Sequence, residues 1–389
     1  MAFDAATRAR VLATVDRLIA ERIAPRARAV DADDVFPRDL WQAMSEAGLF
    51  GLGIAEEYGG LGRDLLTPLL ISERIARASG AVALTFNNST DSVVPIAEAA
   101  QPALKARLLP RLAGGELIPC ISISEPGGGS DVGAIRTTAR RDGDVYRLDG
   151  RKMWCTNGNV GDVFTVFAKT DLEAGSRGLT AFVVEAGMAG FARGPAEPLI
   201  GLRGSPVAEL TFENVAVPIG NRLGEEGEGF RIAMLTLNES RLHCAATALG
   251  VARAALDLAM SHARDRKQFG KPLFEHQGMM FHLADLATAL AAARALWKTT
   301  ARRLESENTR AVGTEAAMTK LHCANVAMRI VTEAVEVMGA SGLTRALDAE
   351  RLMRDAKAFQ IYDGASLVQK SNIGRDLYRN GLPFDFLDP

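Results

Sequence analysis

Asp363 lies in the segment Ile361-Tyr-Asp-Gly-Ala-Ser366, between two stretches of helical composition. Aspartate beside glycine at such a junction commonly caps the next helix, because its side-chain oxygen accepts a hydrogen bond from a free backbone N–H group. A second interpretation is a carboxylate directed into a pocket, where it can act as a general base. The residue types alone leave both interpretations open.

Serine and glycine are concentrated in Ile121-Ser-Ile-Ser-Glu-Pro-Gly-Gly-Gly-Ser-Asp131, at the end of an expected β-strand. Glycine lets the backbone approach a ligand closely, and free N–H groups with the hydroxyls of Ser124 and Ser130 suit carbonyl or phosphate oxygens. An ordinary surface turn has the same composition. The segment therefore indicates either a ligand-binding loop or a simple turn.

Two further segments have both a functional and a structural interpretation. In Lys152-Met-Trp-Cys-Thr-Asn-Gly158 the flat indole of Trp154 can cover a planar cofactor, although tryptophan at such a position is more often core. Arg266-Lys-Gln-Phe-Gly-Lys271 ends an expected long helix in a basic patch, with Gly270 as the helix stop. Neither segment identifies a function alone.

The positions of histidine and cysteine argue against metal and disulfide chemistry. The histidines form neither an HExxH motif nor a two-histidine metal spacing, and we interpret them as packing or surface residues: His243, His262, His276, His282 and His322. The cysteines are far apart and show no CxxC spacing, which predicts reduced thiols in a cytosolic protein: Cys120, Cys155, Cys244 and Cys323.

The positions of proline divide the chain into the regions that must position these residues. Twelve of the 15 prolines occur at or before Pro218, so residues 273–382 are expected to be almost entirely helical. Residues 8–23 show helical periodicity, and further helices are expected from Pro37 and near Leu65. Between the N-terminal and C-terminal helical regions, alternating apolar and polar residues and Asp-Gly turns predict consecutive strands over 136–141, 145–148, 163–169, 179–185 and 208–217.

Length and charge bound the remaining possibilities. The 389 residues predict two to three domains, and the helical, β, helical order lacks the βαβ alternation of a dinucleotide-binding fold. Lys+Arg 45 against Asp+Glu 47 gives a formal charge of -2, which provides no basic field for a nucleic acid. No apolar run is expected to be long enough for a membrane span, so a cytoplasmic protein is predicted.

Taken together in this order and spacing, the segments resemble the acyl-CoA dehydrogenase family over essentially the whole chain. Further matching segments are Leu202-Arg-Gly-Ser205, Glu209-Leu-Thr-Phe-Glu-Asn-Val-Ala-Val-Pro218 and Gly224-Glu-Glu-Gly-Glu-Gly-Phe230. The resemblance implies an α+β fold: an N-terminal helical domain (1–116), a central β domain (117–226) and a C-terminal four-helix bundle (227–389). It also implies FAD held between the β domain and the C-terminal helices.

The resemblance extends to the residues that bind FAD. Ile121, Ile123 and Ser124 match the strand that lines the flavin, and Trp154 and Thr156 match the pair that covers and hydrogen-bonds it. The motif that reaches the FAD of a neighbouring subunit is matched by Arg266, Gln268 and Phe269, and Gln277 matches a further contact. A shared site of this kind implies a homo-oligomer, typically a tetramer.

The chain departs from the family at several FAD positions. Glu336 stands where many members have glutamine, Ala340 replaces a glycine, and Ala365 with Leu367 replaces a polar pair. Backbone contacts to FAD can survive such changes, whereas side-chain contacts to its adenylate half are in doubt.

The resemblance also implies an acyl-CoA site. Ser130 matches a position that contacts acyl-CoA, and Ser240 and Arg241 match the helix segment beside the thioester and pantetheine. The family's base lies in a Tyr-Glu-Gly sequence, here Tyr362-Asp363-Gly364, so Asp363 is the expected base, with Gly364 beside the substrate. Such a base removes the α-proton while FAD accepts the β-hydrogen as hydride, and neither a metal nor a catalytic triad is required.

Aspartate in place of glutamate at 363 shortens the side chain by one C–C bond, about 1.5 Å. We hypothesise that the substrate's α-carbon lies closer to the base, as in a cyclic or α-branched acyl group. Asp91 lies in the segment that lines the family's acyl pocket and is a second candidate, with helix capping as the alternative. Relatives that act on cyclohexane- and cyclohexene-carboxyl-CoA use aspartate chemistry, which supports a ring substrate by analogy.

Two other functions compete with this one. A nitroalkane-oxidase-like enzyme also uses an aspartate base, but Ser130 and Arg241 at the CoA positions argue against it. A flavin-binding protein without catalysis is disfavoured by the carboxylate at 363. The family suggests electron-transferring flavoprotein as the electron acceptor.

Overall fold

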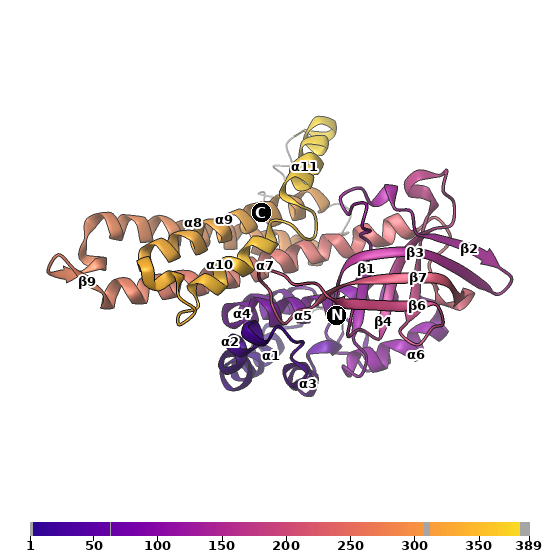
Figure 1. Ribbon diagram of the computed structural model, residues 1–389, viewed down its shortest axis with the longest axis horizontal. Helices are drawn as coiled ribbons and strands as arrows, with labels where there is room; N and C mark the ends of the chain where they lie inside the picture. The colour runs from indigo at the N-terminus through magenta and orange to yellow at the C-terminus, as the bar shows by residue number, and fades with distance from the viewer. Residues whose placement is uncertain (1–2, 63, 307–311, 382–389) are drawn as a thin grey trace.

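Helices, strands and again helices follow one another in the computed structural model, which describes residues 3–62, 64–306 and 312–381 (Figure 1). The first region is helical and lies along one side of the molecule: α1 (Ala5–Leu18), α2 (Ala24–Asp33), α3 (Arg38–Glu46), α4 (Leu66–Ala78), α5 (Gly80–Ala99) and α6 (Pro102–Ala113). The helix predicted over 8–23 forms, but residues Ile19–Ile23 are a π-helical segment that continues directly into α2. Short 3₁₀ helices occur at Leu49–Gly51, Glu56–Tyr58, Val132–Ala134, Gly175–Gly178, Ile219–Asn221, Leu273–Glu275 and Gly339–Leu343.

The middle region is a sheet at one end of the molecule (Figure 1). In the described residues it has eight strands: β1 (Pro119–Ser122), β2 (Thr138–Asp142), β3 (Val145–Thr156), β4 (Val163–Lys169), β5 (Leu179–Glu185), β6 (Phe191–Ala196), β7 (Val207–Pro218) and β8 (Arg222–Leu223). Their order is β6-β7-β3-β2-β4-β5-β8, and β1 pairs in parallel with β4. All five predicted strands form; β4 and β5 are buried on both faces, whereas buried and more exposed residues are mixed along β3 and β7.

The two predicted Asp-Gly turns have different outcomes. Asp142-Gly143 joins β2 to β3, and Gly143 has the positive φ of 61° that this tight turn requires. Asp149-Gly150 is not a turn, so this prediction is wrong. β3 continues through it with an irregularity in its pairing to β7, where Gly150 has φ 147° and packs against Thr137. A side chain at Gly150 would lie 2.6 Å from the Thr137 hydroxyl.

The last region is a bundle of long helices extending away from the sheet (Figure 1). It contains α7 (Gly229–Asp265), α8 (Gln277–Ser306), α9 (Gly313–Met338) and α10 (Ala349–Phe359), followed by α11 (Ser366–Asn380). A small hairpin of β9 (Lys267–Gln268) and β10 (Lys271–Pro272) joins α7 to α8 at the far end of the bundle. The mostly helical C-terminal region is confirmed for the described residues; 307–311 and 382 lie outside them.

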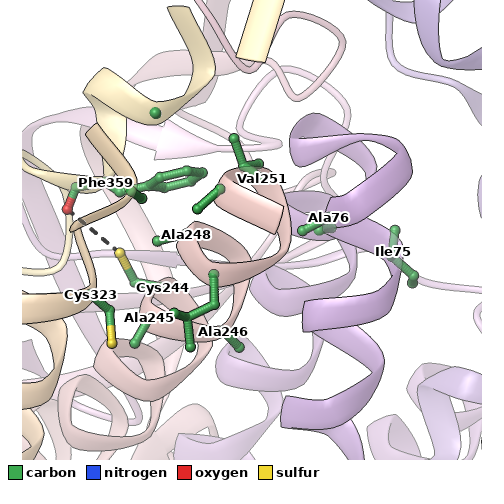
Figure 2. Close-up of a cluster of buried hydrophobic side chains, with 14 of the residues drawn as sticks. Ile75, Ala76, Cys244, Ala245, Ala246, Ala248, Val251, Cys323 and Phe359 are labelled. Atoms are coloured by element: carbon green, nitrogen blue, oxygen red, sulfur yellow. Dashed lines mark hydrogen bonds between the residues drawn. The ribbon is translucent and has the colours of Figure 1, made fainter. Parts of the chain in front are cut away.

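One hydrophobic core joins the first and last regions (Figure 2). Ile75 on α4, Cys244 on α7, Cys323 on α9 and Phe359 on α10 are all buried within it. Gly250 allows α7 to approach α4, because a Cβ there would lie 2.3 Å from the Glu73 carbonyl oxygen. The fold is that predicted, with helical, β and helical regions, and the two helical regions share their packing.

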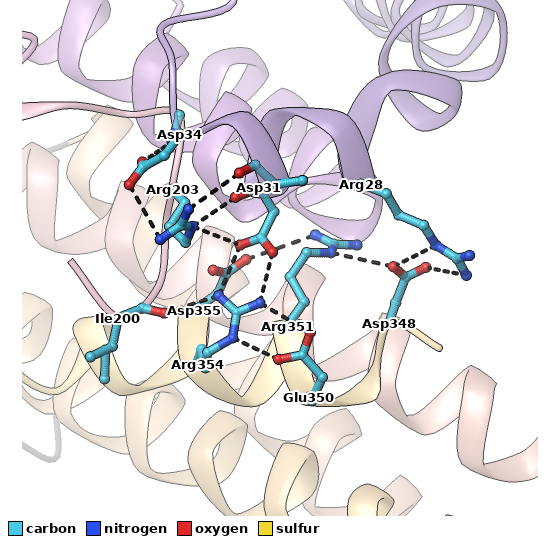
Figure 3. Close-up of polar contacts among 12 residues, drawn as sticks. Arg28, Asp31, Asp34, Ile200, Arg203, Asp348, Glu350, Arg351, Arg354 and Asp355 are labelled. Atoms are coloured by element: carbon cyan, nitrogen blue, oxygen red, sulfur yellow. Dashed lines mark hydrogen bonds and ion pairs between the residues drawn. The ribbon is translucent and has the colours of Figure 1, made fainter. Parts of the chain in front are cut away.

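Ion pairs also connect the three regions (Figure 3). Arg354 on α10 donates to Asp31 on α2 at 2.7 Å and to the carbonyl of Ile200, in the loop that follows β6, at 2.9 Å. From that loop, Arg203 donates to the Asp31 carbonyl at 2.7 Å. The position of α10 is therefore fixed from two sides, and α10 leads directly to Asp363.

Two helices are long and apolar enough to cross a membrane, although no such segment was expected from the sequence. In α7 the apolar window is 67% buried, and in α8 it is 22% buried. The core helix of a soluble protein meets the same criteria of length and composition. Charged residues such as Arg253 in α7 and Arg294 in α8 interrupt these helices, so the expectation that no uninterrupted apolar run has this length is not contradicted.

Candidate active site

The turn that carries Asp363 connects α10 to α11 and has left-handed backbone conformations at Asp363 (φ 53°) and Gly364 (φ 93°). Lys320 of α9 donates from Nζ to the Gly364 carbonyl at 2.7 Å, and Gln369 donates from Nε2 to the Asp363 carbonyl at 2.8 Å. The cap residue of α11 is Ala365, with no side-chain cap hydrogen bond. The helix-cap interpretation of Asp363 is therefore wrong, and its carboxylate is available for another role.

Opposing effects set the protonation state of the Asp363 carboxyl group. The pKa of Asp363 is raised to about 6. Desolvation is the largest effect, and it outweighs the lowering by the cations Lys320 and Arg241 and by a hydrogen bond from Ser240. Ser240 and Arg241 on α7, both predicted as substrate contacts, are buried beside this carboxylate. The result is a carboxylate that is ionised at neutral pH with a pKa close to the range suited to a general base.

Asp91 lies within α5, far from the ends of that helix, so the helix-cap alternative is wrong. Its side chain borders a cavity of about 50 Å³ that is also lined by Glu239 and His243. Burial raises the pKa of Asp91 well above its usual value, and the charges of Asp363 and Glu239 raise it further. The two predicted carboxylates, Asp91 and Asp363, therefore lie near enough for the charge of one to affect the pKa of the other.

The ends of β1 and β3 bring the predicted flavin-lining residues together. Ile121 lies in β1, with Ile123 and Ser124 directly after it; Trp154 and Thr156 lie in β3. The two segments are joined by a hydrogen bond of 2.9 Å from the Met153 amide to the Ser124 carbonyl.

Trp154 has φ 63° and is 56% exposed, so the core interpretation of this tryptophan is wrong. An exposed indole presents a flat apolar face that suits a planar cofactor such as FAD. The glycine-rich segment is a turn closed by reciprocal backbone hydrogen bonds of Glu125 with Gly128, and Ser130 is exposed on it. Its role as a ligand-binding loop stays a prediction.

The remaining predicted FAD residues lie at the other end of the molecule. Arg266 is the cap residue of α7, and Gln268 and Phe269 belong to the β9–β10 hairpin, far from the sheet (Figure 1). Phe269 is 94% exposed, and Gly270 lies in the hairpin rather than at the helix end, which corrects the predicted helix stop. Gln277 begins α8, and Glu336 and Ala340 are exposed at the end of α9. One chain therefore does not bring the two groups together, whereas Ala365 lies beside Asp363.

Sequence reasoning missed Lys320 and treated His243 only as a packing or surface residue. Both are buried, with 0% and 3% exposure. A lysine at helical spacing from Ala316, Cys323 and Ala324 on an otherwise apolar face is the signal that could have identified Lys320. Among the described residues, no group of three or more histidine, cysteine, aspartate or glutamate side chains could hold a metal ion.

Comparison with known proteins identifies the fold and the family. The N-terminal, middle and C-terminal domains of acyl-CoA dehydrogenases match residues 6–116, 120–215 and 227–378. A cyclohex-1-ene-1-carbonyl-CoA dehydrogenase from Geobacter metallireducens is 42% identical, over 91% of this chain and 93% of that protein. A mitochondrial isovaleryl-CoA dehydrogenase from Oryza sativa is 38% identical, over 94% and 90%.

A solved structure agrees with these sequence matches. The butyryl-CoA dehydrogenase of Megasphaera elsdenii superposes with a TM-score of 0.93 at 36% identity, covering 97% of this chain and all of that one. The fold and the site together define a flavoprotein oxidoreductase of the CoA thioester class. The chain belongs to the acyl-CoA dehydrogenase family, whose members use FAD, and it is an acyl-CoA dehydrogenase that acts on CH–CH donors.

Proposed function

We propose that this enzyme oxidises cyclic or α-branched acyl-CoA thioesters, with Asp363 as the base that removes the α-proton. The observation that carries the proposal is the pair of carboxylates: Asp363, in the turn after α10, lies close enough to Asp91, on α5, for its charge to raise the pKa of Asp91. Asp363 is one C–C bond shorter than a glutamate, about 1.5 Å, so the α-carbon must lie closer to it. A ring or a branch at the α-carbon fills the pocket differently from a straight chain and supports that placement.

The chain's own residues account for the proton chemistry. Asp363 is ionised at neutral pH, and its turn is fixed by Lys320 and Gln369, so little motion is needed before proton transfer. Arg241 and Lys320 place positive charge beside Asp363, which offsets the cost of keeping a desolvated carboxylate ionised. FAD, when bound, accepts the β-hydrogen as hydride.

Two groups of residues would hold FAD in this proposal. Trp154 and Thr156, with Ile121, Ile123 and Ser124, would line the flavin, and Ser130 and Gly364 would contact the acyl-CoA. The second group would serve a neighbouring subunit: Arg266, Gln268, Phe269, Gln277, Glu336 and Ala340. The separation of their elements within one chain supports a site shared between copies of the chain, which we propose to be a homotetramer. We also propose that electron-transferring flavoprotein accepts the electrons from FAD and that the enzyme is located in the cytoplasm.

The substrate proposal is tested by measuring kcat/KM for straight-chain, branched and cyclic acyl-CoAs of similar size with an artificial electron acceptor. We expect the cyclic or branched substrates to be preferred by about tenfold or more, the scale on which pocket shape discriminates between acyl groups. A clear preference for butyryl-CoA or octanoyl-CoA would contradict the substrate proposal but would leave Asp363 as the proposed base.

A further inference from the structure

A chain of buried polar side chains lies behind Asp91. His243 Nδ1 lies 2.9 Å from the Ser72 hydroxyl, and the Ser72 hydroxyl lies 2.5 Å from Asn87 Oδ1. Asn87 in turn donates from Nδ2 to the Thr247 hydroxyl at 2.8 Å, and Thr247 donates to the His243 carbonyl at 2.9 Å. Three helices contribute to this network: Ser72 comes from α4, Asn87 from α5, and His243 and Thr247 from α7.

The directions of these hydrogen bonds determine where the histidine proton lies. Thr247 uses its proton on the His243 carbonyl, so it accepts from Asn87 Nδ2, and Asn87 Oδ1 then faces Ser72 as an acceptor. Ser72 has one proton, and its neighbours Asn87 Oδ1 and the Pro68 carbonyl are both acceptors. Ser72 must therefore accept from His243, which places the proton on Nδ1.

His243 consequently presents an unprotonated nitrogen to Asp91. Burial lowers the pKa of His243 to about 3, so the ring is neutral, and a neutral imidazole with its proton on Nδ1 has only an acceptor at Nε2. Nε2 lies 3.7 Å from Asp91 Oδ1. That oxygen is buried and has no hydrogen-bond partner among the described residues. An ionised Asp91 would place its negative charge against the lone pair of His243 Nε2, which is unfavourable.

We propose that Asp91 is a neutral carboxylic acid in the resting enzyme and that His243 is the positioning residue that keeps it protonated. A protonated Asp91 can donate to Nε2 of His243 or to an acceptor atom on a bound acyl group. The acid and base of the site are then divided between two aspartates, Asp91 as the donor and Asp363 as the base. This division of roles rests on the proposed function, whereas the protonation state of Asp91 does not.

The other charges around Asp91 favour the same state. Asp363 and Glu239 both raise the pKa of Asp91, and burial raises it most. The thiol of Cys244 and the phenol of Tyr362 also interact with Asp91; their own pKa values are raised, so both groups are neutral and add no charge. The cations Lys320 and Arg241 act on Asp363. Two neighbouring carboxyl groups with different surroundings, here the buried Asp91 and the half-buried Asp363, are a known arrangement for separating acid from base.

Infrared difference spectroscopy of the FAD-loaded enzyme tests the protonation state without any acyl-CoA. Subtracting the spectrum of Asp91→Asn from that of the unaltered enzyme at pH 7 should show the carbonyl stretch of a protonated carboxylic acid. The result that overturns the proposal is a difference spectrum with carboxylate bands only. Because no turnover is involved, failure of the substrate or base proposal does not affect this result.

Ser72→Ala tests the role of His243. Without the Ser72 acceptor, His243 can move its proton to Nε2 and donate to an ionised Asp91, so the midpoint at which the Asp91 acid band disappears should fall by at least about one pH unit, a tenfold change in acidity. The matched control is Ser89→Ala, since buried Ser89 on α5 donates to the Thr85 carbonyl; its midpoint should not change. An unchanged midpoint in Ser72→Ala, with flavin absorbance and fold retained, would overturn the positioning role.

Discussion

Lys320 is a buried ammonium group that contacts the turn carrying the proposed base. Its side chain is 0% exposed and donates to the Gly364 carbonyl at 2.7 Å. Its positive charge also lowers the pKa of Asp363, in opposition to desolvation. A single residue of α9 thus affects both the geometry and the ionisation of the carboxylate.

Replacing Lys320 with methionine is expected to shift the pH dependence of flavin reduction. The base must be ionised to accept a proton, so the rate falls as pH falls through the pKa of Asp363, about 6. Loss of the cation raises that pKa, and the acid limb should move to higher pH by about one unit. The measurement is the rate of flavin reduction from pH 5 to 8 by stopped flow.

Lys320→Arg is the control for this prediction, because it retains the positive charge. Its acid limb should stay near that of the unaltered enzyme, even if the larger side chain lowers the rate. An acid limb in Lys320→Met that coincides with that of the unaltered enzyme would show that Lys320 has no electrostatic effect on the base.

At the scale of elements, β3 and the glycine-rich segment are held together by a buried ion pair. Lys152 of β3 donates from Nζ to Glu125 at 2.8 Å and to the Ile123 carbonyl at 3.0 Å. Glu125 also accepts from the backbone N–H groups of Arg136 and Thr137. Burial lowers the pKa of Lys152 to about 8, against the attraction of Glu125, so the lysine is still charged at neutral pH.

Lys152→Met should destabilise the protein by about 3–5 kcal/mol, because it leaves the buried Glu125 carboxylate without its cation. It should also weaken FAD retention, since the proposed flavin-lining residues Ile123 and Ser124 directly precede Glu125 and Lys152 also binds the Ile123 carbonyl. Chemical unfolding and the flavin content after gel filtration measure the two effects. Arg151→Met is the matched control on β3, where the ion pair with Glu209 is exposed and should be worth about 0–1 kcal/mol. Equal losses from both variants would contradict the prediction.

Most elements could be predicted from the sequence because their signals are local. Proline placement, residue alternation and Asp142-Gly143 depend only on neighbours in the chain. Asp149-Gly150 has the same letters as a turn, but its role depends on Thr137, which packs against Gly150 from another segment. The π-helical segment at Ile19–Ile23 likewise has no local signal in the sequence.

The candidate site shows the same division between local and distant information. Asp363 and Asp91 were predicted from their segments and the resemblance. Lys320 lies 43 residues before Asp363, and His243 meets Ser72 across 171 residues of sequence. No single segment of the sequence shows the helix packing that brings these side chains together, so their roles could be inferred only from the structure.

At the scale of the whole molecule, the predicted FAD residues fall into two groups at opposite ends of the folded molecule (Figure 1). Trp154 and Thr156 lie at the sheet, whereas Arg266 and Phe269 lie at the hairpin beyond the bundle. Phe269 is 94% exposed, a state that a large apolar side chain rarely keeps without a partner surface. If both groups bind FAD as proposed, a complete FAD site requires a second copy of the chain.

Sedimentation equilibrium with flavin absorbance tests the assembly. The FAD-loaded protein should have four times the 41.5 kDa mass of the chain, and dilution or salt that dissociates it should release FAD. Phe269→Ala should weaken both assembly and FAD retention while the secondary structure stays intact by circular dichroism. A monomer that keeps FAD as firmly as the assembled protein would contradict a site shared between subunits.

Single-turnover flavin reduction in the Asp363→Asn variant tests the central claim most directly. Asparagine has nearly the same shape but cannot accept the α-proton, so acyl-CoA should bind without bleaching the flavin, with a loss of rate of about 10²-fold or more. The FAD content should match that of the unaltered enzyme, because Asp363 is not among the residues proposed to hold the cofactor. Bleaching by acyl-CoA at a near-normal rate in this variant would exclude Asp363 as the base.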